Sequence, residues 1–301
     1  MNELRERILA LKEKKKALIL AHYYQVMDVQ DIADHVCDSF EMARRAFEAK
    51  EELLIICGVR FMAESAKILN PEKTVLLPAP EAGCPMADMI TPKDVGKLKA
   101  KHPDAAIVCY VNSSAAVKAV SDICCTSSSA EKIVRALPQK QIVFIPDRNL
   151  GAYIASKIPD KEIILFDGCC PTHDAATEDD AIQAKQKHPG AKLLIHPECG
   201  AGVLRHADYI GSTAGIISHA LDSGSTDFII GTETGVVERL KRLAPEKGFY
   251  PLKESFLCPD MKKTSLADIY ASLDAGTHEI ILEACEMDAA RKCLERMVET
   301  G

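Results

Sequence analysis

The sequence of 301 residues predicts an α/β protein with three homologous three-layer αβα domains, mainly parallel sheets and a pseudo-threefold arrangement. Two observations lead to this prediction. Short apolar runs alternate with segments of helical spacing, which is typical of parallel sheets covered by helices on both faces. The dipeptide Cys-Pro also returns at an almost fixed interval, at Cys84, Cys170 and Cys258, which are 86 and 88 residues apart. Such a period indicates a repeated unit.

The composition limits the class of protein. The chain is 47% hydrophobic and 27% charged, and it has no apolar run close to the ~18 residues of a membrane span. The N-terminal segment alternates charges with Leu and Ile and lacks the apolar core of a signal peptide, so we expect a cytoplasmic protein without a membrane partner. A net charge of −7 argues against a nucleic-acid partner but not against a small anionic substrate, because a pocket can be locally positive.

The chain has 12 Cys, which we expect to be reduced thiols in the cytoplasm. No C-x-x-C occurs, which excludes thioredoxin-type motifs, most zinc ribbons and the usual ferredoxin run. Cys169 and Cys199 stay open because they lie close to residues typical of sites. Seven others are expected to have no role in a site and to act as small hydrophobes: Cys37, Cys57, Cys109, Cys124, Cys125, Cys285 and Cys293.

Each repeat begins with a helix and a first strand. The segments 3–16, 92–102 and 178–188 have helical apolar spacing and end in Lys or His, as suits a helix C-terminus. The apolar runs that follow them end in polar side chains, at the strand ends where parallel sheets bind ligands. These polar residues are His22 and Tyr24, Tyr110 and Asn112, and His196 and Glu198.

A short second strand and a hydroxyl-bearing turn come next in each repeat. Ser39, Ser127, Ser212 and Thr213 lie between that strand and a helix, where a hydroxyl and free backbone N–H groups form an anion cradle. The alternative for any one of them is an ordinary helix N-cap. Recurrence at three equivalent positions favours function.

Third and fourth strands complete each repeat and lead into the Cys. Gly58, Pro146 and Thr232 end the third apolar runs, each 36 residues beyond the equivalent first-strand residue. We therefore predict domains at 1–88, 89–174 and 175–301. The last also carries closing elements, predicted as a helix over 265–273, a strand over 278–282 and a helix over 284–298. These should close the last unit or pack back on the first.

Three equivalent loops about a threefold axis would bring three Cys to one point. Zinc structural sites normally take four ligands. A [4Fe–4S] cluster held by three Cys instead leaves one iron open, and an open iron is a Lewis acid. The alternative is three structural Cys inherited by triplication.

The motifs resemble those of the quinolinate synthase family along nearly the whole chain. They are LAHYYQ, QDIADHVCDS, GVRFMAESAKILNP, GCPMAD, YVNSSA, ICCTSSSA, PDRNLG, CPTH, HPEC, IGSTAG, GTETG and CPDMKK. The resemblance implies three αβα domains around a central [4Fe–4S] cluster with one iron not bound by Cys, which acts as a Lewis acid. It also implies condensation of iminoaspartate with dihydroxyacetone phosphate to quinolinate, phosphate and water in de novo NAD biosynthesis, and functional coupling to an oxidase or dehydrogenase that makes iminoaspartate.

The resemblance also implies roles for single residues. Cys84, Cys170 and Cys258 match the cluster ligands, Glu198 the general base that isomerises the triose, and Tyr24 a catalytic Tyr. Tyr110, also expected to be catalytic, and Asn112 match residues that contact substrate near the open iron. The groups expected to hold carboxylates and phosphate are His22, Ser39, Ser127, His173, His196, Ser212, Thr213 and Thr232.

Some positions depart from the family or stay ambiguous. Tyr23 stands where the family usually has Asn, and Cys169 could in principle replace Cys170 as a ligand. The last ligand lacks the C-x-x-C-x-x-C of some members, so no redox switch of that kind is expected. Lys262 and Lys263 are expected to be solvated rather than phosphate ligands. Two rival hypotheses are a radical S-adenosylmethionine enzyme of the diphthamide-synthesis type and a non-catalytic iron or redox scaffold.

Overall fold

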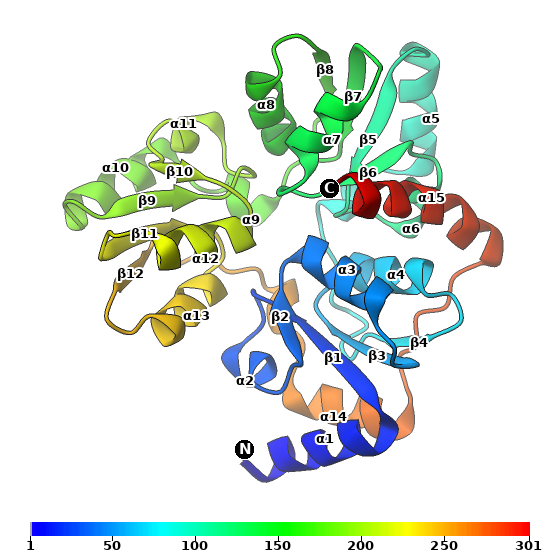
Figure 1. Cartoon of the computed structure of the whole chain (residues 1–301). Coiled ribbons are helices and arrows are strands. Elements are labelled where there is room, and N and C mark those ends of the chain that lie inside the picture. Colours follow the sequence, from blue (N-terminus) through cyan, green and yellow to red (C-terminus); the bar gives the residue numbers. More distant parts are fainter. Residues whose placement is uncertain (1) are drawn as a thin grey trace.

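The computed structural model describes residues 2–301 and contains three lobes around a common centre (Figure 1). Each lobe is built on one four-stranded, fully parallel sheet, and the strand order is the same in all three: β2-β1-β3-β4, β6-β5-β7-β8 and β10-β9-β11-β12. The predicted fold class is confirmed. We call the lobes unit 1, unit 2 and unit 3 in chain order.

The strands lie where the apolar runs predict them. Unit 1 contains β1 Ala17–His22, β2 His35–Cys37, β3 Leu53–Cys57 and β4 Thr74–Leu76. Unit 2 contains β5 Ala106–Tyr110, β6 Ile123–Cys125, β7 Gln141–Ile145 and β8 Glu162–Leu165. Unit 3 contains β9 Lys192–Ile195, β10 Tyr209–Ile210, β11 Asp227–Gly231 and β12 Gly248–Pro251. All three sheets lie within the predicted domain ranges; the boundaries themselves stay a prediction.

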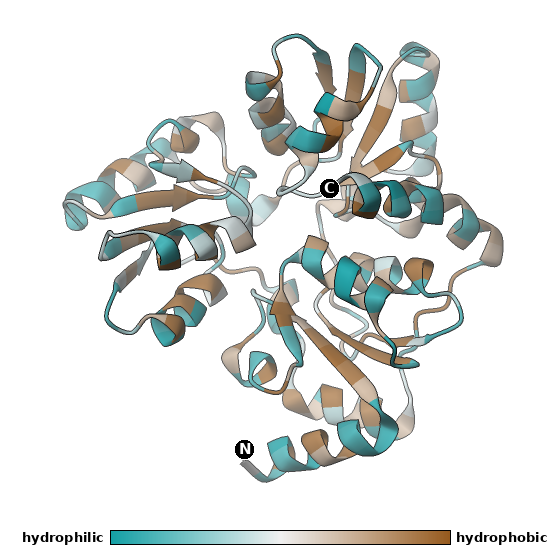
Figure 2. Ribbon diagram, in the orientation of Figure 1, coloured by the Kyte–Doolittle hydropathy of each residue, from teal (hydrophilic) through white to brown (hydrophobic). Residues whose placement is uncertain are grey.

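The central strands are apolar on both faces because helices cover both faces of each sheet, as the brown strands of Figure 2 show. In unit 1, α1 Asn2–Lys15 and α2 Met27–Gln30 lie on one face, and α3 Ser39–Glu48 and α4 Arg60–Leu69 lie on the other. The further helices are α5 Pro92–Lys101, α6 Ala115–Ala119, α7 Ala130–Ala136, α8 Arg148–Lys157, α10 Glu178–Lys187, α11 Ala201–Leu204, α12 Thr213–Asp222 and α13 Gly235–Leu243. The predicted helices that open the repeats thus coincide with α1, α5 and α10. Within residues 2–301, no helix is both long and apolar enough to cross a membrane.

The C-terminal elements pack away from unit 3. Helix α14 Leu266–Ala275 lies against α1, and α15 Ala284–Thr300 packs against α4 of unit 1 and α6 and β6 of unit 2 (Figure 1). The strand predicted over 278–282 is wrong. That segment makes one antiparallel bridge, from Glu279 to Leu76 of the three-residue strand β4, so it lacks the pairing length of a strand.

Candidate active site

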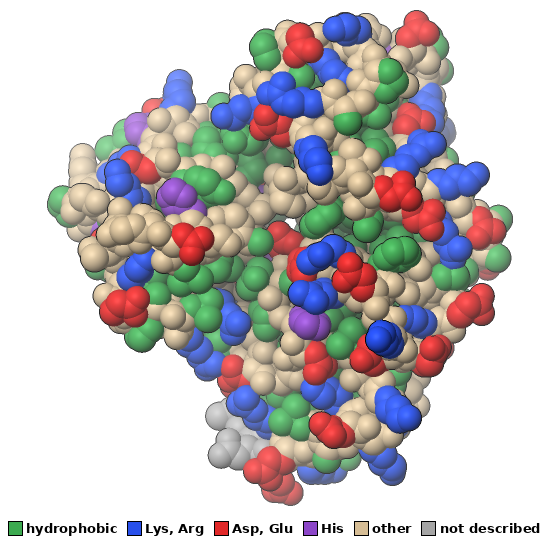
Figure 3. Space-filling view, viewed as in Figure 1, with side chains coloured by type: hydrophobic (Ala, Val, Ile, Leu, Met, Phe, Trp, Pro, Cys, Tyr) green, Lys and Arg blue, Asp and Glu red, His purple; other side chains and the backbone are tan. Residues whose placement is uncertain are grey.

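One cavity lies where the carboxyl ends of the three sheets converge, and all three units line it. The space-filling view is hollowed where the lobes meet (Figure 3). The cavity brings together nearly all the predicted site residues: His22, Tyr24, Ser39, Cys84, Tyr110, Asn112, Ser127, Cys170, His173, His196, Glu198, Thr213 and Cys258. Ser212 and Thr232 lie just behind the lining, and Cys169 and Cys199 are not part of it.

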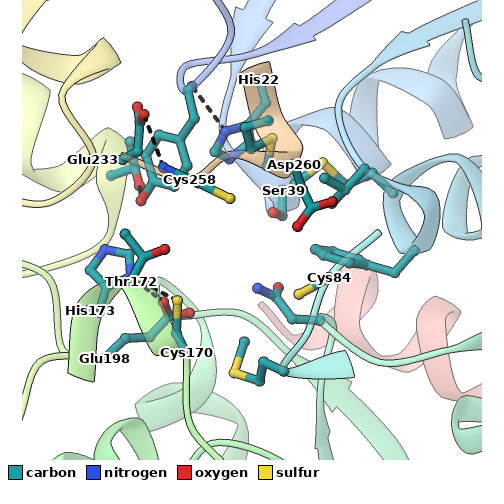
Figure 4. Close-up of a pocket in the computed structure, with 18 of the residues that line it drawn as sticks. His22, Ser39, Cys84, Cys170, Thr172, His173, Glu198, Glu233, Cys258 and Asp260 are labelled. Atoms are coloured by element: carbon teal, nitrogen blue, oxygen red, sulfur yellow. Dashed lines mark hydrogen bonds and ion pairs between the residues drawn. The ribbon is translucent and has the colours of Figure 1, made fainter. Parts of the chain in front are cut away.

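The three Cys lie at equivalent turns and point into the same space (Figure 4). Each Cys-Pro pair lies at or just before the start of a short helix: η1 Ala87–Met89, α9 Pro171–Asp174 and η2 Asp260–Lys262. In each turn the backbone N–H of the third residue after the Cys, which belongs to Ala87, His173 or Met261, acts to lower the pKa of the thiol. All three thiols are free.

Burial raises the pKa of Cys84 to about 12 and also raises the pKa of Cys170 and Cys258. Buried thiolates therefore require a compensating cation, and the turn N–H groups that point at the sulfurs compensate only part of the charge. Three soft sulfur donors in a partly apolar cavity suit an iron–sulfur group. The donor set thus fits the predicted cofactor.

Turns after β1 and β9 present the polar pairs of units 1 and 3. The N–H of Tyr24 lies 3.2 Å from Nδ1 of His22, and the N–H of Glu198 lies 3.4 Å from Nδ1 of His196. His196 and Glu198 lie in the turn that follows Ile195, and this turn points both side chains into the cavity.

Both carboxylate oxygens of Glu198 have close partners in the cavity. Tyr110 donates to its Oε1 at 2.6 Å, and Nδ1 of His173 lies 2.8 Å from its Oε2. Burial opposes ionisation, but the neighbouring His173 and His196 and these hydrogen bonds outweigh burial and keep the pKa of Glu198 below its usual range. Glu198 is therefore a buried carboxylate with a fixed orientation.

Tyr24 belongs to a different part of the same network. Its hydroxyl lies 3.0 Å from Oγ1 of Thr213 and 2.8 Å from Oγ1 of Thr232, and Thr232 lies 2.9 Å from Nε2 of His173. Burial, followed by the charge of Glu198, raises the pKa of Tyr24, so the phenol keeps its proton. A continuous hydrogen-bonded chain thus runs from Tyr24 through Thr232 and His173 to Glu198.

Two of the His residues that the sequence predicts to bind anions are neutral. Burial lowers the pKa of His22 to about 3 and of His196 to about 4, so both imidazoles are uncharged near pH 7. Among the residues that the structure describes, no Lys or Arg lines the cavity. Hydroxyls, imidazole N–H groups and helix N-termini are the donors that remain for an anion.

The hydroxyls of these turns differ in what they contact. Ser212 is the N-cap of α12 and accepts from the N–H of Gly215 at 3.2 Å, which is the ordinary capping role. Ser39 is not a cap, because Asp38 caps α3. Ser127 lies 3.2 Å from Nε2 of His196. Ser39, Ser127 and Thr213 therefore present hydroxyls to the cavity.

The sequence prediction missed an ion pair beside the thiols. Glu233 is 0% exposed, and its Oε1 lies 2.9 Å from Nζ of Lys262, which also donates to the backbone oxygen of Tyr24 at 2.6 Å. The expectation of a solvated Lys262 is wrong because the buried carboxylate requires a countercharge. Lys263 also forms an ion pair, with Asp260 at 2.6 Å. Aligning the repeats at Thr232 could have drawn attention to Glu233.

Fold and cavity together define a class: a triplicated α/β enzyme with a central site in which three thiols face an acid–base network. A family model described as Quinolinate synthetase A protein matches residues 6–299. The chain belongs to the quinolinate synthase family, enzymes of de novo NAD biosynthesis. Because the chain belongs to this family, we set aside the hypotheses of a radical S-adenosylmethionine enzyme and of a non-catalytic scaffold.

Curated relatives are similar over almost their whole length. The Quinolinate synthase of Caldicellulosiruptor saccharolyticus is 48% identical over 299 residues, which is 99% of each chain. That of Caldicellulosiruptor bescii is 50% identical over 298 residues, covering 99% of this chain and 98% of the relative. That of Clostridium kluyveri is 49% identical over 288 residues, covering 96% and 95%.

Proposed function

We propose that this chain condenses iminoaspartate with dihydroxyacetone phosphate in the central cavity, giving quinolinate, phosphate and water. The observation that carries the proposal is the hydrogen-bonded chain from Tyr24 to Glu198 beside three converging thiols. A site for this reaction needs a base, an acid and several anion-binding groups within one small volume, and the cavity contains groups suited to each task.

We propose that Cys84, Cys170 and Cys258 hold a [4Fe–4S] group. Such a group, when bound by three thiols, supplies one iron without a protein ligand, which is a Lewis acid for a substrate oxygen. Nearby hydrophobic side chains keep the surroundings dry: Phe61, Met62, Met86 and Met261 line the same cavity.

Glu198 is the proposed base. A carboxylate kept ionised in a buried site can take a proton from the carbon next to the triose carbonyl and return it to the neighbouring carbon, which isomerises ketone to aldehyde. Tyr110 and His173 fix its two oxygens, so the lone pairs have one orientation. Tyr24 keeps its proton and is the proposed donor to a developing alkoxide or amine, with Thr232 and His173 as the return path for the proton.

The substrates together carry two carboxylates and one phosphate, and the cavity has three hydroxyl-bearing turns, at Ser39, Ser127 and Thr213. With His22 and His196 as further neutral donors, we propose that these turns hold the three anionic groups. Neutral donors suit this task because they bind an anion without trapping the product as a buried ion pair would. Holding both reactants together accounts for several kcal/mol of the barrier.

The same proposal covers the organisation of the chain and the supply of substrate. We propose domains at 1–88, 89–174 and 175–301, the last with C-terminal helices that pack on units 1 and 2.

Because an imine hydrolyses readily in water, iminoaspartate must come from an oxidase or dehydrogenase that oxidises aspartate close to the time of use.

An anaerobic assay tests the proposal. The purified protein is given dihydroxyacetone phosphate and freshly generated iminoaspartate, and quinolinate is measured by mass spectrometry. Quinolinate that forms with wild type and is lost with Glu198→Gln at unchanged iron content supports the proposal. Cleavage of S-adenosylmethionine without quinolinate would overturn it in favour of the radical-enzyme hypothesis.

A further inference from the structure

Each Cys loop is tied to the end of the third strand of its own unit. In each unit a helix or turn follows the third strand. Its first residue donates its backbone N–H to the backbone oxygen of the residue two positions before the Cys. These bonds are Arg60 to Ala82 at 2.9 Å, Arg148 to Gly168 at 2.8 Å, and Thr234 to Phe256 at 2.9 Å. The side chain one position earlier, which faces the same loop, differs between the units: Val59, Asp147 and Glu233.

In unit 2 this side chain binds the Cys directly. Asp147 is 0% exposed; one carboxylate oxygen accepts from the N–H of Leu150 at 2.7 Å and the other from the N–H of Cys170 at 3.0 Å. The loop lies so close that a Cβ at Gly168 would be 2.6 Å from the backbone oxygen of Pro146. Position 168 therefore requires glycine.

In unit 3 the same position binds less tightly. Glu233 accepts from the N–H of Gly235 at 2.7 Å and from the N–H of Cys258 at 3.4 Å, and it shares the second oxygen with Lys262. Figure 4 shows the contact between Glu233 and the Cys258 loop. The longer bond and the shared oxygen make this the weaker anchor.

In unit 1 the equivalent residue, Val59, cannot accept a hydrogen bond. The Cys84 loop is instead held from unit 3, where Asp260 accepts from the N–H of Gly83 at 3.2 Å. Lys263 completes this contact by donating to Asp260 at 2.6 Å and to the backbone oxygen of Glu81 at 2.8 Å.

A buried carboxylate beside thiol sulfurs is electrostatically unfavourable, so its presence in unit 2 needs a reason. Only a carboxylate offers an acceptor at both ends, and both oxygens of Asp147 face backbone donors. We propose that Asp147 is a positioning residue that fixes the Cys170 loop, so that its thiol stays in place for the shared metal group, and that Glu233 serves Cys258 more weakly. This inference rests on the proposed three-thiol site.

Two substitutions separate positioning from helix capping. Asp147 also caps α8, and Ser and Asn are good caps. Asp147→Ser keeps the cap but cannot reach Cys170, and Asp147→Asn turns an amide donor toward one of the two N–H groups. Ser265→Ala removes the cap of α14 and none of the bonds that hold a Cys loop, so it is the matched control.

The readout is the rate at which anaerobic, iron-loaded protein releases iron to an excess of ferrous chelator, with the electron paramagnetic resonance spectrum of the reduced protein. Each variant leaves one buried backbone N–H without its acceptor, so both Asp147 variants should release iron at least about tenfold faster than wild type. Their spectra should also change. Glu233→Gln should show a smaller change, and Ser265→Ala none.

Release rates and spectra equal to wild type in both Asp147 variants, while Cys170→Ala has lost its iron, would overturn the positioning role and leave the three-thiol site standing. Wild-type behaviour of Asp147→Ser alone would reduce Asp147 to a helix cap. Full iron content in Cys170→Ala would overturn the three-thiol site, and the inference with it. If the Asp147 variants do not fold, a wild-type rate of iron release in Glu233→Gln would count against the positioning role proposed for Asp147 and Glu233.

Discussion

The turns that follow the first strands of units 1 and 3 have the same backbone design and opposite chemistry. Each begins with a His whose Nδ1 faces the N–H two residues later, and each presents that later residue to the cavity. In unit 1 the later residue is Tyr24, whose pKa is raised by burial and by Glu198. In unit 3 it is Glu198, whose pKa is lowered against the effect of burial by His173, His196 and Tyr110.

Under the proposed function, this difference lets a repeated unit supply both an acid and a base. The backbone turn fixes where the side chain lies, and its neighbours decide whether that side chain keeps its proton. Tyr24 lies among hydroxyls, whereas Glu198 lies among His and Tyr donors. Two groups whose pKa values are pushed apart in one cavity are the pattern expected of an acid–base pair.

The largest effect is expected from Glu198→Gln. The amide keeps the shape but is not a base, so kcat should fall by ~10²–10⁴-fold with little change in KM. Steady-state kinetics at matched iron content measure this. A kcat within about threefold of wild type would show that Glu198 is not the base, since even weak acid–base catalysis exceeds that factor.

Tyr24→Phe should have a smaller effect, a ~10–100-fold fall in kcat, because the hydroxyls of Thr213 and Thr232 remain as alternative donors. Tyr23→Phe is the matched control, since the neighbouring side chain does not line the cavity. Equal losses in the two variants would contradict a specific role for Tyr24.

Because His22 and His196 are buried and neutral, we expect the free energy of unfolding to depend on pH. The pKa of His22 is about 3 in the folded chain and 6.5 ordinarily, so between these values the unfolded chain binds more protons. The contribution of neutral His22 to the stability of the fold is complete above pH 6.5 and is lost as the pH falls toward 3. His22→Asn keeps an acceptor for the N–H of Tyr24 but removes the group that takes up a proton on unfolding. The slope of unfolding free energy against pH should therefore fall by an amount that corresponds to at most about one proton. Urea unfolding at several pH values measures this, and an unchanged slope would contradict it.

The smallest effect is expected from the hydroxyl that serves as a cap. Ser212→Ala should lower stability by ~1 kcal/mol with little effect on kcat, because Ser212 caps α12 behind the cavity lining. Ser39→Ala should instead raise KM, because its hydroxyl faces the cavity. The reverse pattern would mean that the two Ser residues have exchanged roles.

Much of this structure could be predicted because triplication repeats every signal. The Cys-Pro interval and the apolar runs indicate the same unit three times, and the converging strand ends follow from the parallel sheets. The predictions that failed depend on contacts between residues that are far apart in the sequence. A strand over 278–282 was predicted from apolar residues, but only the short edge strand β4 was within reach. Lys262 looked solvated because its partner, Glu233, is 29 residues away in the sequence.

The iron and sulfide content of the anaerobically purified protein tests the central claim, that one thiol from each unit holds a single metal group. Cys84→Ala, Cys170→Ala and Cys258→Ala are compared with wild type, and Cys169→Ala is the adjacent control. The account predicts about four irons per chain in wild type and in Cys169→Ala, and loss of the group in each of the other three. Full iron in any of those three, or its loss in Cys169→Ala, would contradict the account.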